Sequence, residues 1–427
     1  MYTRKILAIV LALIPITSWS QNYSDYELST LKFVASGQSS YTQGEDLAIA
    51  QNELGIRYFY GRGGAPKNLE SAAYWFEKSA SNGHKYGQYN IAMRYYYGQG
   101  VSKSLSQSLY WFEKAGRQNH HESSLKAGKM HFHGEGTDVN YTKAVKFFKD
   151  AAFGDIAEGK YYYALCYENG FGVQRDSTKA LIWANRAIDS EDYDAYLILG
   201  RMYAEGETVT QNKSKALYYY EKGSEKGINS CTNALGVGYE KGTFVEKDIY
   251  KAIEYFTLAA SNGYKYGKYN AARLYQNPEN PIYDLKKAEM WYISLVKDGY
   301  KEYELDLIDI YNTTDNMSEK FKIYKRRVDE GDVRFMNTLA YMYVNGQGTT
   351  ASLDKAIETI EKALYLDPDN LNYLDTKGDI YLIWGDIKKA GKIWKSINKK
   401  NPHFYDKPTE GYNESDLNKY FISNPVK

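Results

Sequence analysis

Polar, small and aromatic residues recur along the chain at a fixed interval of 36 residues. The first member of the pattern is an Asn, Ser or Asp, whose side chain accepts a hydrogen bond from the free N–H groups of a helix's first turn. Four residues later comes a small residue and three further an aromatic one, so both lie on one helix face. The pattern therefore predicts seven helices that begin after Asn68, Ser104, Asn140, Asp176, Asn212, Asp248 and Asp284.

A second helix-forming pattern precedes each of these starts. It contains an apolar residue followed by a small one, as in Leu199-Gly200, and an aromatic residue three positions after the pair, as in Tyr203. A glycine then ends it, because a left-handed helix cap favours a residue without a Cβ atom. The glycines in this register are Gly61, Gly98, Gly134, Gly170, Gly206 and Gly242. Two short helices in every 36 residues predict αα-hairpins, each of which needs its neighbour to cover an apolar face.

The pattern resembles the Sel-one-like repeat, a longer relative of the tetratricopeptide repeat. In one unit it reads Tyr163-Ala164, Tyr167, Gly170-x-Gly172, Asp176, Lys179-Ala180 and Trp183. The resemblance implies an all-α fold, an αα-hairpin repeat solenoid that winds as a right-handed superhelix of about ten hairpins.

The repeats predict the domain organisation. We expect a signal peptide at 1–20, an N-terminal arm or capping helix at 21–46, and seven repeats at 47–300. A degenerate short repeat follows at 301–333, repeats that resemble both the Sel-one-like and the tetratricopeptide type at 334–402, and a polar tail or cap at 403–427.

The beginning of the chain has the pattern of a signal peptide. Arg4 and Lys5 precede an apolar run from Ile6 to Ile16, and small residues at Ser18 and Ser20 suit a cleavage site. The run is too short to span a bilayer and no later stretch is more apolar, so we expect no transmembrane segment. The pattern predicts export and a periplasmic or extracellular protein.

Charge argues against a nucleic-acid partner. Without Arg4 and Lys5, 52 of the 54 basic residues remain against 53 acidic ones, a net charge of −1. A nucleic-acid-binding chain would show a basic excess or stripe.

The residues that could carry chemistry fit the repeat instead. His131 stands where other repeats have a packing tyrosine, and His133 points away from it on the same helix, so we expect no metal site. Cys166 and Cys231 occupy apolar or small positions about two repeats apart, so we expect both to be buried and no disulfide between them. The Gly-x-Gly turns lack the βαβ context of a nucleotide loop. No catalytic constellation stands outside the register, which indicates a non-enzyme without a cofactor.

Tyrosine is abundant, with 45 of 427 residues. Tyrosine offers wide and rigid contact area, so tyrosines on a groove are candidates for recognition. We expect an exported scaffold or adaptor that binds a protein or peptide partner in a concave groove. An envelope or surface glycan-binding protein that uses exposed tyrosines and an enzyme accessory unit are the alternatives.

In tetratricopeptide-type hairpins the first helix lines the concave face. Its free positions are counted from the apolar residue of the pair: one lies two residues before it, and the others lie two, five and six residues after it. The residues at such positions are Tyr89, Met93, Tyr96, Tyr97, Lys129, Phe132, His133, Tyr161, Glu168, Arg201, Tyr269 and Arg273. The N-terminal positions are mainly aromatic and the C-terminal ones more charged, so we expect the partner to contact the aromatic part.

Overall fold

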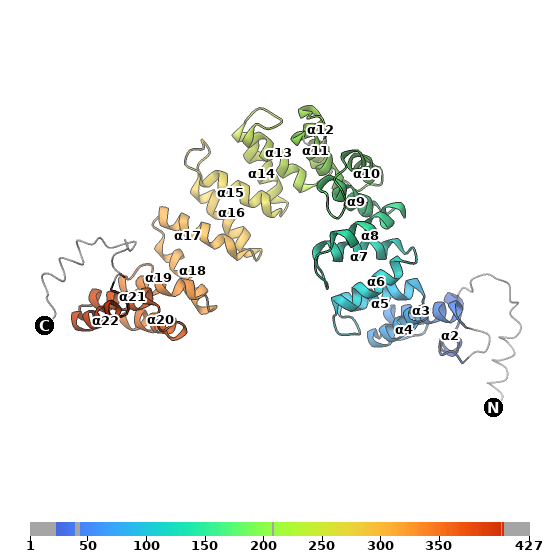
Figure 1. Ribbon diagram of the computed structural model, residues 1–427, viewed down its shortest axis with the longest axis horizontal. Helices are drawn as coiled ribbons and strands as arrows, with labels where there is room; N and C mark the ends of the chain where they lie inside the picture. The colour runs from blue at the N-terminus through green and yellow to red at the C-terminus, as the bar shows by residue number, and fades with distance from the viewer. Residues whose placement is uncertain (1–22, 39–42, 207–208, 403, 405–427) are drawn as a thin grey trace, which may run out of the picture. The chain divides into compact units, whose positions relative to one another are not determined.

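The computed structural model describes residues 23–38, 43–206, 209–402 and 404. These residues form α-helices and short 3-10 helices without a β-strand, so the predicted all-α class is confirmed (Figure 1). The predicted signal peptide lies outside the described residues, as does the predicted tail at 403–427 except for residue 404. The chain divides into two compact units, Met1–Ala252 (unit 1) and Ile253–Lys427 (unit 2), which are described separately.

Unit 1 consists of consecutive αα-hairpins after a short N-terminal part. Its helices are η1 (Tyr23–Asp25), α2 (Leu28–Ala35), α3 (Glu45–Tyr60), α4 (Leu69–Ser81), α5 (Lys85–Tyr97), α6 (Leu105–Gly116), α7 (His121–His133), α8 (Tyr141–Phe153), α9 (Ala157–Asn169), α10 (Ser177–Asp189), α11 (Ala195–Glu205), α12 (Lys213–Glu225) and α13 (Asn229–Lys241). From α3 on, each odd-numbered helix is the first of a hairpin and the next even-numbered helix is the second (Figure 1).

Unit 2 continues the alternation. The boundary between the units falls within α14 (Ile249–Ser261). The remaining helices are α15 (Lys265–Gln276), α16 (Leu285–Lys297), η2 (Lys301–Tyr303), α17 (Glu304–Thr313), α18 (Met317–Asp329), η3 (Val333–Phe335), α19 (Met336–Asn345), α20 (Leu353–Leu366), α21 (Leu371–Ile383) and α22 (Ile387–Lys400). The pair α17 and α18 lies within 301–333, where the sequence predicts a degenerate short repeat.

The predicted helix starts are confirmed in all seven repeats. In each one the Asn, Ser or Asp side chain accepts a hydrogen bond from the backbone N–H three residues later, over 2.7 Å at Asn68 and 3.3 Å at Ser104. The six predicted glycines that end the first helices all have positive φ. The second helices of the repeats also end at a positive φ, which Asp155 and Glu191 adopt without being glycine.

Close contact between the two helices of a hairpin explains the small residue of each pair. A Cβ atom on Gly55 would lie 2.6 Å from the Phe76 ring, and one on Gly200 would lie 2.5 Å from the Tyr220 ring. Protein interiors are packed too tightly to accept such an overlap. Gly55 and Gly200 therefore let a large aromatic residue of the second helix pack directly on the first helix.

The helix α2 packs on the first hairpin. Leu31 and Val34 are buried against Leu54 of α3, and the Gln51 side chain donates a hydrogen bond to the Ala35 carbonyl over 3.1 Å. An end repeat exposes an apolar face that a capping element must cover. The helix α2 covers this face of α3.

Candidate functional site

The first helices of unit 1 form a common surface, which we call the first-helix face: the sides of α3, α5, α7, α9 and α11 that carry side chains linking one first helix to the next. Asn90 of α5 donates a hydrogen bond to Asn52 of α3 over 2.9 Å. Lys129 of α7 pairs with Glu158 of α9 over 2.6 Å. These bonds join side chains from successive hairpins, so a ligand on this face would contact several repeats.

A small pocket of about 100 Å³ lies on this face between α5 and α7. Its lining residues are Met93, Tyr96, Tyr97, Phe112, Lys126, Lys129, Met130 and Glu135. Tyr96 donates a hydrogen bond to a Glu135 carboxylate oxygen over 3.0 Å. This bond, together with burial, raises the pKa of the Tyr96 phenol. Four residues that the sequence predicts for partner binding thus line one pocket: Met93, Tyr96, Tyr97 and Lys129.

Aromatic side chains continue beyond the pocket onto α7 and α9. The Phe132 ring centroid lies 5.7 Å from that of Tyr162, and the Tyr162 ring stacks on Phe148 at 4.7 Å. His133 is exposed, whereas Tyr161 is half-buried, and burial raises the pKa of its phenol. Tyr162 was not predicted as a site residue, because it precedes the apolar member of its pair by only one position.

Two carboxyl groups stand at the edge of this aromatic region. Burial and, to a smaller extent, the negative charge of Asp194 together raise the pKa of Asp192 to about 6. Burial also raises the pKa of Asp194. Both charges act on the phenol of Tyr161, so the first-helix face changes charge near α9 between mildly acidic and neutral pH.

Glu168 and Arg201 were also predicted to face a partner. Glu168 is 3% exposed, and both of its carboxylate oxygens accept hydrogen bonds from Arg201, over 2.8 and 2.6 Å. These two side chains satisfy each other and link α9 to α11. Their charges are already compensated within the chain.

The remaining predicted residues are placed as follows. Tyr89 is half-buried, and its ring centroid lies 4.9 Å from that of His120. Tyr269 and Arg273 lie on α15 in unit 2, where the Tyr269 ring centroid is 5.4 Å from that of Tyr303.

Besides Tyr162, three further residues of the first-helix face were missed in the sequence. Phe59 and Tyr60 lie five and six positions after Leu54, so the same offsets applied to the first hairpin would have found them. Arg94 lies three positions after Ile91, where the following hairpins have apolar residues. An arginine at a position that is apolar in the following hairpins is the sequence signal that could have identified Arg94.

The histidine and cysteines considered in the sequence for metal binding or a disulfide, His131, Cys166 and Cys231, are buried. His131 is 1% exposed, lies 2.7 Å from a Glu113 carboxylate oxygen and stacks on Phe147, so the predicted packing role is confirmed. Cys166 and Cys231 are both buried and free, and burial raises the pKa of each thiol to about 12. Within the described ranges, no three His, Cys, Asp or Glu side chains are arranged to hold a metal ion.

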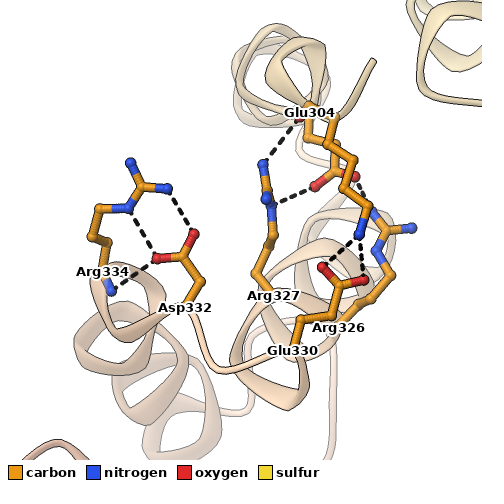
Figure 2. A network of polar contacts seen from close by, with 7 residues as sticks. Glu304, Arg326, Arg327, Glu330, Asp332 and Arg334 are labelled. Carbon is orange, nitrogen blue, oxygen red and sulfur yellow. Dashed lines mark hydrogen bonds and ion pairs between the residues drawn. The ribbon is translucent and has the colours of Figure 1, made fainter. Parts of the chain in front are cut away.

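A dense polar network lies in unit 2 around Glu304 of α17 (Figure 2). Glu304 is 1% exposed and pairs with Arg326 over 2.6 Å and with Arg327 over 2.7 Å. The Arg327 contact lacks the alignment of a hydrogen bond and is an ion pair. Nearby, Glu330 pairs with Lys301 over 2.8 Å. The network joins α18 to η2 and α17, and both of its carboxylates are paired with cations.

None of the described helices is long and apolar enough to cross a membrane. This finding concerns only the part of the chain that the structure describes.

A family model for the Sel1 repeat matches the chain eight times. The matched residues are 48–84, 85–120, 121–152, 157–192, 194–228, 230–264, 265–300 and 334–366. They include every regular hairpin from α3 to α16 and leave out the degenerate pair α17 and α18. The curated proteins gave no match.

Several solved structures are similar to this chain. A protective antigen of uropathogenic Escherichia coli with an SLR fold is 22% identical, with 93% of each chain covered and a TM-score of 0.45. A Sel1 repeat protein from Oxalobacter formigenes is 28% identical over 55% of this chain and 94% of that one, with a TM-score of 0.42. A Sel1 repeat protein from Klebsiella pneumoniae is 21% identical over 47% of this chain and 98% of that one, with a TM-score of 0.32.

Repeat scaffolds of this kind generally mediate protein–protein interactions, and Sel1 repeat proteins are typically non-catalytic. The matched repeats account for more than half of the residues. The chain belongs to the Sel1 repeat family.

Proposed function

We propose that this protein is an exported, non-catalytic scaffold that binds a protein or peptide partner on the first-helix face of unit 1. The observation that carries the proposal is the pocket between α5 and α7 with its aromatic surroundings. Tyr97, which lines the pocket, is 56% exposed, and Tyr60, which like Tyr97 interacts with Arg94, is 65% exposed. Exposed aromatic side chains next to a pocket and charged residues are the composition of binding hot spots.

The charges on this face support a partner that is partly polar. Lys126 and Glu135 line the pocket together with apolar Met93 and Phe112. A peptide could place an apolar side chain in the pocket and form polar contacts at its rim. Among the described residues we find nothing that favours the glycan-binding alternative.

A matched pair of double variants tests the binding face. Tyr60→Ala with Tyr97→Ala removes two exposed phenols from the first-helix face. Tyr74→Ala with Tyr110→Ala removes two phenols of similar exposure, 52% and 46%, from second helices. Each of the four rings makes an edge-to-face contact with the adjacent aromatic residue, so the two double variants cost similar stability.

The readout is binding of peptides selected from a random display library against the full chain, measured by calorimetry. We expect the Tyr60/Tyr97 variant to lose at least about tenfold in affinity, because aromatic hot-spot residues contribute 2 kcal/mol or more. The Tyr74/Tyr110 variant should bind like the unchanged protein. Equal binding by both variants, or a loss confined to the Tyr74/Tyr110 variant, would place the binding face elsewhere.

A further inference from the structure

Arg94 of α5 is a largely buried cation that forms no ion pair with any of the described residues. The residue is 8% exposed, and its buried Nε atom has no hydrogen-bond acceptor. No carboxylate or acceptor oxygen of the described residues is within bonding distance of the guanidinium. Only its Nε atom is both buried and without an acceptor. Because a partly buried charge without a counter-charge is unfavourable, the free protein carries a cost that a bound anion would reduce.

Aromatic side chains surround this guanidinium. Its Cζ atom lies 3.9 Å from the centroid of the Phe59 ring. Tyr60, Tyr89 and Tyr97 are close enough to interact with it electrostatically, and burial lowers its pKa. An arginine nevertheless keeps its charge in proteins. In such a partly dehydrated site, attraction between the guanidinium and an incoming anion is stronger than in water.

Arg57 of α3 occupies the same position in the preceding hairpin, and there the guanidinium is fully paired. Its Nη2 donates hydrogen bonds to the carbonyls of Tyr23 and Ser24 over 3.1 and 2.9 Å. Its Nε donates to Glu53 over 3.2 Å. The segment before the first hairpin thus supplies acceptors to Arg57, and nothing equivalent reaches Arg94.

The fold does not require an arginine at this position. The next three hairpins have Met130, Cys166 and Met202 there, and all three are buried. At the site that corresponds to Glu53, the second hairpin has Asn90, whose amide bonds to Asn52. The second hairpin therefore keeps the cation and lacks its carboxylate.

We propose that Arg94 binds a carboxylate of the partner: the side chain of an Asp or Glu in a peptide segment that also carries an apolar residue. This inference rests on the proposed function and names the chemistry of its partner. The planar guanidinium presents paired N–H donors that match a carboxylate. A phosphorylated side chain would bring almost two negative charges to a single guanidinium.

The apolar part of the same peptide has a place next to Arg94. Tyr97 stands beside the guanidinium and also lines the pocket between α5 and α7, together with Met93 and Met130. An acidic side chain on Arg94 and a neighbouring apolar side chain in the pocket would occupy one continuous part of the first-helix face.

Stability separates a binding role of Arg94 from a structural one. Arg94→Met introduces the residue that the chain itself has at Met130, and it removes an unpaired charge. We expect its melting temperature to equal or exceed that of the unchanged protein. Arg57→Met, at the same position of the first hairpin, should melt at a lower temperature, because Glu53 and two carbonyls lose their donor. A fall for Arg94→Met as large as that for Arg57→Met would overturn the proposal.

Binding is then measured with peptides selected from a random display library against the full chain. Each selected peptide is compared with a counterpart in which Asp is replaced by Asn or Glu by Gln. We expect acidic residues in the selected peptides and an affinity about 10- to 100-fold higher for the acidic form, the range of a charge-assisted hydrogen bond. Arg94→Met should abolish this difference, and Arg94→Lys should keep part of it. Arg117→Met, which removes an exposed arginine of α6, is the control.

The outcomes separate this inference from the proposed function. Equal affinity for acidic and amide peptides, with binding still lost in the Tyr60/Tyr97 variant, would overturn the role of Arg94 and leave the binding face in place. Binding that is unaffected by the tyrosine changes, or a library that yields no binding peptide, would overturn both.

Discussion

The Glu304 network of unit 2 and the Arg94 site of unit 1 both remove a charge from solvent, and they do so with opposite results. Glu304 is 1% exposed and lies against two arginines (Figure 2). Arg94 is 8% exposed and lies against aromatic rings without a carboxylate. Burial of a charge is therefore a poor sign of a binding residue in this protein. A buried charge without a counter-charge is a better one.

The regular and degenerate hairpins differ in what holds them together. In α6, a regular second helix, Leu109, Trp111 and Phe112 are all buried. In α18, Ile323 is the buried residue. Ion pairs therefore contribute to the attachment of α18 where apolar packing is small. Charge has a structural role in the degenerate hairpin, whereas the second helix of the regular hairpin around Arg94 packs through apolar side chains.

The largest effect on stability is expected at Glu304. Glu304→Ala leaves Arg326 and Arg327 without their carboxylate, and breaking a buried ion pair costs about 3–5 kcal/mol. We expect this loss in the free energy of unfolding, together with faster hydrogen exchange in α18. Glu330→Ala removes a more exposed carboxylate, the partner of Lys301, and should cost much less, because solvent screens an exposed ion pair. Similar small losses for both variants would mean that packing, not the network, holds α18.

Asp379 of α21 is a buried carboxyl group that accepts a hydrogen bond but pairs with no cation among the described residues. Tyr341 of α19 donates this bond, and burial raises the pKa of Asp379 to about 7. Since the folded state holds this proton more tightly than the unfolded state, the contribution to stability is complete below about pH 4 and is lost as the pH rises to about 7.

Asp379→Asn keeps an acceptor for Tyr341 and removes the titration. We expect the variant to be more stable than the unchanged protein at pH 8. Its stability should not decrease between about pH 4 and 7, as that of the unchanged protein does. Chemical denaturation at several pH values measures this. An unchanged pH profile would show that Asp379 titrates alike in the folded and unfolded states.

A smaller effect is expected at a helix start in unit 1. Asp176→Ala removes the acceptor for the Lys179 N–H and should lower the free energy of unfolding less than Glu304→Ala does. Hydrogen exchange should become faster in α10, from Lys179 to Ala187. Asp189→Ala, an exposed change at the other end of the same helix, is the control. Unchanged protection in α10 for Asp176→Ala would show that the cap contributes little to a repeat supported by its neighbours.

Much of the fold could be predicted because the repeat places the same chemistry at the same position. The N-cap at Asp176 and the glycine at Gly170 are local features with a direct structural meaning, and both are confirmed. Asp155 and Glu191 adopt the same positive φ as the glycines in their register, and their side chains gave no sign of it. Both residues lie in helix-ending turns, where the Asp155 N–H donates to the Ala152 carbonyl and the Glu191 N–H to the Ile188 carbonyl.

The candidate site was harder to predict because contacts between repeats decide which side chains remain available. Tyr96 and Tyr97 were predicted and line a pocket. Glu168 and Arg201 were predicted from the same offsets, yet they are bonded to each other. Arg94 falls in a core register, so an offset rule for exposed positions passes over it. Its role depends on the absence of a partner, which only the three-dimensional arrangement reveals.

The most direct test of the central claim is the NMR signal of the Arg94 side-chain N–H, assigned by its disappearance in Arg94→Met. The account predicts that a selected acidic peptide shifts the Arg94 Nε–H resonance strongly and leaves that of Arg57, which is already paired, nearly unchanged. The amide counterpart of the same peptide should shift neither. An Arg94 resonance that stays in place while the acidic peptide binds, or that responds equally to both peptides, would contradict the account.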